Sequence, residues 1–101
     1  MENKKLFELL KQMNLEVAYN HFNKKIEPPF IIYDDDDPTT FKADDKVYKK
    51  INNYIVDLVT SKKDVKLENQ LEQLFDDNNI PYEKTSDYIE DEKIYQIEYT
   101  I

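Results

Sequence analysis

Carboxylates are the side chains of this sequence whose number and spacing could support chemistry. Four consecutive aspartates, Asp34–Asp37, follow a short apolar segment. A calcium loop would need alternating ligands, a glycine at its sixth position and a bidentate glutamate at its twelfth. Pro38 and the residues after it do not supply them, so the run predicts a solvated turn or a partner-facing loop rather than a metal site. We define this predicted interaction loop by Asp34, Asp35, Asp36, Asp37, Phe41, Asp44 and Asp45.

A second set of carboxylates recurs every four residues: Glu68, Glu72 and Asp76. In a helix this spacing places all three on one face. Carboxylates held close together can act as general acid and base, but a stripe of this kind on a surface helix is usually a solvated face. Two interpretations stay open: a solvated face, or a face turned toward a channel or a basic partner.

Few other residues are candidates for catalysis. His21 is the single histidine and there is no cysteine, so a Cys/His zinc site cannot form. The sequence also has no glycine and no arginine. Phosphate loops, dinucleotide-binding turns and nucleophile elbows need glycine, and bidentate clamps on phosphate need arginine. We therefore expect a protein that is not an enzyme, with no catalytic residues, no metal and no cofactor.

Composition narrows the class of protein further. A chain of 101 residues indicates one domain, residues 1–101. The net charge is −8 and the lysines are scattered in pairs among more numerous acids, so tight binding of nucleic acid is not expected. No segment approaches the ~20 apolar residues of a membrane span, and none resembles a signal peptide. We expect a soluble, intracellular protein that does not enter a membrane.

Periodicity of the apolar residues predicts the elements that carry these side chains. The order of elements, with mostly hairpin-like connections, predicts an α+β fold in which an antiparallel sheet of four to five strands carries two helices on one face. The predicted helices cover residues 3–13 and 64–77, and the predicted strands cover residues 15–19, 30–33, 47–60, 82–88 and 92–101.

The long predicted strand over residues 47–60 has two apolar faces. Tyr54, Val56 and Leu58 alternate with a second set of apolar residues, and alternate side chains point to opposite faces of a sheet. If helices cover one face, the other needs a cover of its own, which a helix or a neighbouring subunit could supply. The second set, which we predict as a subunit interface, is Ile51, Ile55 and Val59.

Short, non-catalytic motifs follow one another along nearly the whole chain. After the first helix they are Val17–Phe22, Pro29–Tyr33, Phe41, Ala43-Asp44, Val47-Tyr48, Leu58, Thr60, Lys62–Asp64, Glu68 and the strand that follows Glu92–Tyr95. In their order and spacing, the sequence resembles the tail terminator or head–tail completion proteins of siphophages and prophages of Gram-positive bacteria.

The resemblance implies a structural protein of the virion tail or neck, assembled in the cytoplasm of the host bacterium. Proteins of this kind form a ring, in tail terminators a hexamer, on the finished tail tube. The ring ends polymerisation of the major tail tube protein and receives the head completion or stopper protein, while DNA passes through its centre without specific binding. Six copies of a chain with net charge −8 carry roughly −48, which repels passing DNA.

Two other kinds of protein stay open as alternatives. The chain could be a different connector or stopper component of the same neck, which nothing in the sequence separates from a terminator. It could also be a small acidic binding module, such as a DNA mimic. A DNA mimic would need its carboxylates on one face, and the lysines interspersed along both helices argue against that arrangement.

Overall fold

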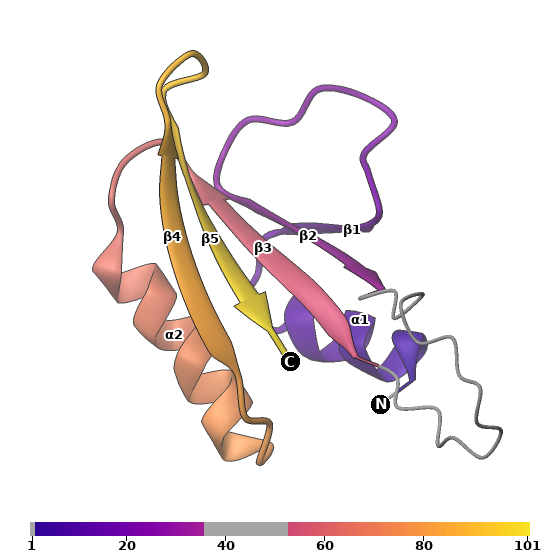
Figure 1. Cartoon of the computed structure of the whole chain (residues 1–101). Helices are drawn as coiled ribbons and strands as arrows, with labels where there is room; N and C mark the ends of the chain where they lie inside the picture. Colours follow the sequence, from indigo (N-terminus) through magenta and orange to yellow (C-terminus); the bar gives the residue numbers. More distant parts are fainter. Residues whose placement is uncertain (1, 36–52) are drawn as a thin grey trace, which may run out of the picture.

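Two helices and five strands make up the structure, a computed structural model that describes residues 2–35 and 53–101. The strands form one sheet in the order β1-β2-β3-β5-β4 (Figure 1). Within the described residues, no helix has the length and apolar character of a membrane span. In chain order the elements are α1 (Asn3–Lys11), β1 (Glu16–Tyr19), β2 (Phe30–Asp35), β3 (Tyr54–Thr60), α2 (Val65–Asp77), β4 (Glu83–Ile89) and β5 (Ile94–Thr100).

The sheet is largely antiparallel, as predicted, with one exception. The pairs β2–β3, β3–β5 and β5–β4 are antiparallel, whereas β1 runs parallel to β2 from Glu16↔Phe30 to Tyr19↔Tyr33. A parallel pair cannot be joined by a tight turn. Residues 20–29 form the longer connection, which carries the chain back to the end of the sheet where it started (Figure 1).

Both helices pack on one face of the sheet, which confirms the predicted α+β arrangement. Leu6 and Leu10 of α1 and Leu71 and Phe75 of α2 are fully buried. Burying such a side chain contributes about 1.5–3 kcal/mol. These helix residues pack against side chains of the sheet that lie in rows across neighbouring strands. By the strand register, one row is Val17, Ile31, Leu58 and Ile97, and the next is Tyr33, Val56 and Tyr99.

In this chain without glycine, aspartate begins α2 and an asparagine of positive φ follows each helix. The Asp64 carboxylate accepts a hydrogen bond from Leu67 N at 3.1 Å and caps α2. At the other end Asn79 adopts φ 56°, and Ile80 N donates to Phe75 O at 2.9 Å. This is a Schellman ending, in which a left-handed residue normally occupied by glycine satisfies the last carbonyls. Asn14, at φ 61°, follows α1 in the same conformation.

The acidic run begins inside a strand, which corrects the predicted start of the interaction loop. Asp34 pairs with Ile55 and Asp35 with Tyr54, so β2 continues two residues beyond its apolar part. Backbone pairing with β3 and polar partners for both carboxylates make this extension favourable. The other loop residues, Asp36, Asp37, Phe41, Asp44 and Asp45, lie outside the described part of the chain, as do residues 47–52 of the long predicted strand.

Candidate functional site

The candidate site is the face of the sheet that neither helix covers, which we call the open face. Alternation along each strand determines its members, because side chains two residues apart share a face and paired residues lie side by side. Its residues are Glu16 and Ala18 of β1; Phe30, Ile32 and Asp34 of β2; Ile55, Asp57 and Val59 of β3; Ile94, Gln96, Glu98 and Thr100 of β5; and Glu83, Thr85, Asp87 and Ile89 of β4.

Every ionisable residue that the strands place on the open face is acidic. Asp57 lies directly opposite Glu98, and Asp34 stands diagonally across from Asp57 on the other side of β3. Direct cross-strand neighbours have Cβ atoms about 4.5–5.5 Å apart, and diagonal neighbours are about 7–8 Å apart. The carboxylates therefore form a band across the sheet, which consists of Glu16, Asp34, Asp57, Glu83, Asp87 and Glu98.

Asp57 shows the electrostatic cost of this band. Burial raises the pKa of its carboxyl group, and the charges of Glu98 and Asp34 raise it further, while a hydrogen bond from Gln96 acts in the opposite direction. The Oδ1 atom of Asp57 is buried and has no hydrogen-bond partner within the described residues. A cation brought to this position would relieve both the repulsion and the unsatisfied acceptor.

The open face also has an apolar part, at the end nearest the β1–β2 connection. Phe30, Val59 and Ile94 lie together in a groove of about 560 Å³. Charges of both signs stand around it, with Lys25 and Lys93 beside two glutamates. The full lining is Lys25, Ile26, Glu27, Pro28, Phe30, Val59, Ser61, Glu92, Lys93 and Ile94. Apolar and acidic areas thus lie next to each other on one surface, a composition found in protein interfaces.

The predicted interface residues fall partly on this face. Ile55 and Val59 both project from β3 away from the helices, as the alternation predicted. Ile55 is half-buried, whereas Val59 is only 5% exposed because Phe30 and its other neighbours already cover most of it. Ile51 lies outside the described residues.

The predicted carboxylate face of α2 is divided by the structure. Only Asp76 is exposed; Glu68 is 2% exposed and turns toward the sheet. Lys84 Nζ lies 2.8 Å from Glu68 Oε1 and 2.7 Å from Glu72 Oε2, and Lys63 Nζ lies 2.9 Å from Glu68 Oε2. Glu68 and Glu72 therefore hold α2 to β4 within one molecule, so the prediction of one solvated or partner-facing stripe is wrong for these two residues.

The titration behaviour of this ion cluster follows from its contacts. Burial alone would raise the pKa of Glu68, but hydrogen bonds and attraction from Lys84 and Lys63 outweigh burial and lower it. Glu72 behaves in the same way, with Lys84 and the Tyr99 hydroxyl as its donors. Tyr99 donates to Glu72 Oε2 at 2.7 Å, and burial together with this bond raises the pKa of the phenol. Both carboxylates are thus ionised and paired within the molecule.

Asp34 and Asp35 have partners at the start of the β1–β2 connection. The Tyr19 hydroxyl donates to Asp35, and this bond, with burial and the negative charges nearby, raises the pKa of Tyr19 to about 12. Asn20 Nδ2 donates to Asp34 Oδ2 at 3.1 Å. His21 is exposed, with Nδ1 3.0 Å from Asn20 Oδ1.

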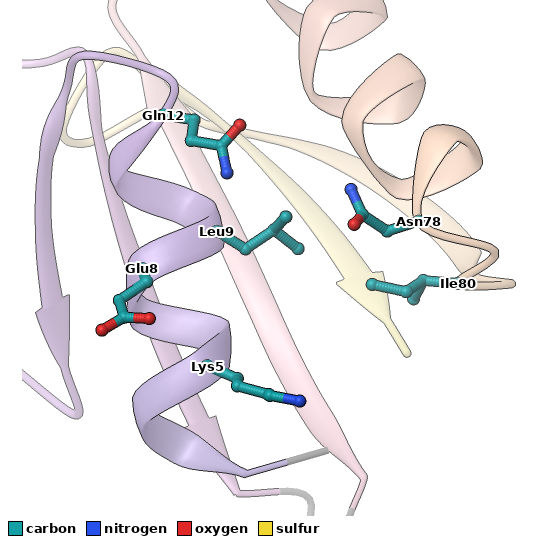
Figure 2. Close-up of a pocket in the computed structure, with 6 residues that line it drawn as sticks. All are labelled: Lys5, Glu8, Leu9, Gln12, Asn78 and Ile80. Atoms are coloured by element: carbon teal, nitrogen blue, oxygen red, sulfur yellow. The ribbon is translucent and has the colours of Figure 1, made fainter.

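A second groove, of about 480 Å³, lies on the helix side of the sheet. Figure 2 shows Leu9 of α1 and Ile80, just after α2, pointing toward one another from its two walls. Polar side chains of α1 and Asn78 surround these two. The mixed lining, Lys5, Glu8, Leu9, Gln12, Asn78 and Ile80, brings no two reactive groups into hydrogen-bond contact within the described residues.

The sequence did not indicate Asp57, Glu98 and Lys84 as important residues. Asp57 interrupts the apolar alternation of residues 55–59, a signal that marks the open face once the strand is known. Glu98 and Lys84 acquire their roles only through strand register and helix docking. In residues 2–35 and 53–101 no group of three or more His, Cys, Asp or Glu side chains is placed to hold a metal ion.

Comparisons with known proteins give no relative: no protein-family model, no curated protein and no solved structure matches this chain.

Proposed function

We propose that this chain is a structural subunit of a phage neck, a tail terminator that forms a ring on the tail tube. In this role it ends polymerisation of the tube protein and presents the ring to the head completion or stopper protein. Its work is done by surfaces that bind other protein chains. It needs no cofactor and no reaction centre.

The open face is the observation that carries the proposal. A sheet with helices on one side only leaves Phe30, Ile32, Ile55 and Ile94 half-buried within one subunit. Adjacent strands place these residues together, and contiguous apolar surface of this kind marks sites of protein–protein contact. A ring subunit requires such a surface, because every copy must contact two neighbours.

The charge of the chain is consistent with a channel through which DNA moves. The net charge of −8 gives a six-membered ring roughly −48 in all. Negative potential around a channel repels phosphates, so DNA would pass without being held. The acidic band of the open face adds to this potential wherever a neighbouring subunit does not neutralise it.

Tube capping tests the proposal directly. The full chain is added to tubes assembled from the tail tube protein encoded with it, and tube ends and lengths are scored by electron microscopy. The expected result is a ring at one end of each tube and arrest of further growth when fresh tube protein is supplied. Tubes that keep growing with no protein bound at their ends would sink the terminator role. A ring found instead on the head completion complex would place the chain at another station of the neck.

A second candidate function is favoured by one observation: all the ionisable residues that the strands place on the open face are acidic. Lysines on the helices argued against a DNA mimic, yet the strands place six carboxylates and no lysine on that surface. A mimic would displace DNA from a basic, histone-like protein, and Glu98→Gln with Asp57→Asn would weaken that displacement. Absence of competition at ~50 mM salt, where charge attraction is weakly screened, would eliminate this candidate.

A further inference from the structure

The open face and helix α1 have complementary charges on opposite sides of the molecule. We infer that the open face of one copy docks against the outer surface of α1 of a second copy. This inference rests on the proposed function for the choice of an identical subunit as partner, and it names the two surfaces that would form the contact.

Helix α1 has a net positive charge, unlike every other helix and strand in the described part of the chain. It carries three lysines, Lys4, Lys5 and Lys11, against the single acid Glu8. Helix α2 has one lysine against four acids, and each of the five strands has more acids than lysines. If the acidic open face binds a helix or strand of a second copy, α1 is therefore the element whose charge is opposite to that of the open face.

The outer surface of α1 combines this charge with an apolar contact. Lys4, Phe7 and Lys11 follow the spacing i, i+3, i+7 and so share one side of the helix. Phe7 is 37% exposed, and Lys11 Nζ lies 6.0 Å from the centre of its ring. A large apolar side chain between two lysines matches an open face on which Ile32 and Ile55 lie beside carboxylates. We call these three residues the α1 stripe.

The dimensions of the two surfaces agree. Lys4 and Lys11 are separated by about 10 Å along the helix axis, at 1.5 Å per residue. Asp34 in β2 and Glu98 in β5 stand on either side of β3, which separates them by about 10–12 Å across the sheet when their offset along the strands is included. The two lysines can therefore reach Asp34 and Glu98 of the acidic band, with Asp57 between them.

The two surfaces cannot meet within one molecule. Helix α1 packs on the face of the sheet opposite to the open face. The contact must therefore join the front of one copy to the back of the next, which is a heterologous arrangement. Repeated contacts of this type close into a ring or continue as a filament. A ring is the assembly that the proposed function requires.

Charge reversal on each surface tests the contact. The full chain is studied by sedimentation velocity at concentrations up to ~1 mM in ~50 mM and ~500 mM salt. Lys4→Glu with Lys11→Glu reverses the charge of the α1 stripe, and Asp34→Lys with Glu98→Lys reverses the two acids of the open face that lie opposite it. Lys66→Glu, at an exposed position on α2, is the matched control. Circular dichroism confirms that each variant is folded.

The expected result is self-association that weakens in high salt. Each double reversal weakens it by roughly tenfold or more, and the control does not. A chain that carries all four reversals recovers association, because the ion pairs between positions 4 and 11 and positions 34 and 98 form again with opposite polarity. Carbodiimide cross-linking of mixed ¹⁴N- and ¹⁵N-labelled chains should join Lys4 or Lys11 of one copy to acids of the open face of another.

Three results would overturn the docking of α1 on the open face. They are a monomer at every concentration and salt, association unaffected by both double reversals, and failure of the four-fold variant to recover association. The proposed function has its own readout in tube capping. A chain that caps tubes while the reversals have no effect would reject this contact and retain the terminator role. A chain that associates as expected without capping would do the opposite.

Discussion

Replacing Lys84 by methionine removes the centre of the ion cluster that joins α2 to β4. Lys84 Nζ contacts Glu68 at 2.8 Å and Glu72 at 2.7 Å, and the Glu68 side chain is 3% exposed. Methionine keeps most of the length and packing of the lysine stem and removes its charge. The change therefore leaves a buried carboxylate oxygen, Glu68 Oε1, without its donor.

The magnitude follows from how deeply each partner is buried. Removing one partner from a fully buried ion pair costs about 3–5 kcal/mol, and breaking an exposed pair costs about 0–1 kcal/mol. This pair lies between those limits, because Lys84 is 33% exposed and Glu68 keeps its contact with Lys63. We expect a loss of about 2 kcal/mol in the free energy of unfolding, which lowers the melting temperature of a domain this size by about 8–16 °C.

Urea and thermal unfolding of Lys84→Met, beside Lys66→Met on the exposed surface of α2, measure this loss. A third chain combines Lys84→Met with Glu68→Leu, so that neither charge of the pair remains. We expect this chain to be more stable than Lys84→Met alone, because an unpaired buried charge costs more than an apolar replacement of both partners. Amide exchange in β4 should quicken in the single variant. The reasoning is refuted if Lys84→Met is no less stable than the Lys66→Met control, or if the combined variant is less stable than the single one.

Three further predictions concern single residues. Burial and nearby acids raise the pKa of Asp57, so its charge lowers stability at neutral pH, and this penalty disappears as pH falls below that pKa. In urea unfolding, Asp57→Asn should stabilise the chain by about 0.5 kcal/mol at pH 7 and by much less at pH ~4. Equal stabilisation at both pH values would contradict this expectation. Asn79 adopts φ 56°, so Asn79→Ala should lower the free energy of unfolding by about 1 kcal/mol, while Asn79→Gly should change it little. Equal melting temperatures for the two variants would count against the Schellman ending. The Tyr19 hydroxyl donates to Asp35, and this bond helps to raise its pKa to about 12. NMR should therefore find the Tyr19 hydroxyl protonated at pH ~11 in the original chain and ionised in the Asp35→Asn variant. Identical titration curves for the two chains would show that the bond does not form in solution.

Much of the fold could be predicted from local patterns. Alternation along residues 54–59 separates Tyr54, Val56 and Leu58 from Ile55 and Val59, because the side-chain period of a strand is fixed by its backbone. Asp64 and Asn79 mark the ends of α2 through bonds to residues within a few positions. Such features depend on neighbours in the sequence, and the sequence therefore contains enough to predict them.

The candidate site depended on partners distant in the chain. Asp34 and Asp35 continue β2 because they pair with Ile55 and Tyr54 of β3. The parallel direction of β1 depends on the connection to β2, whose path no local pattern specifies. The acidic band exists because register brings residues from separate strands together.

Glu68 shows the same division between sequence and tertiary structure. Its four-residue spacing from Glu72 and Asp76 predicts that the three side chains share one helix face, but the spacing does not say which face meets the sheet. Docking turns Glu68 inward, where Lys84 and Lys63 compensate the cost of burying its charge. The sequence by itself determined the elements and the alternation of their side chains, because those follow from short-range backbone geometry. Tertiary structure alone decided which charges are paired inside the molecule and which stay on the open face, because that choice depends on contacts between segments far apart in the chain.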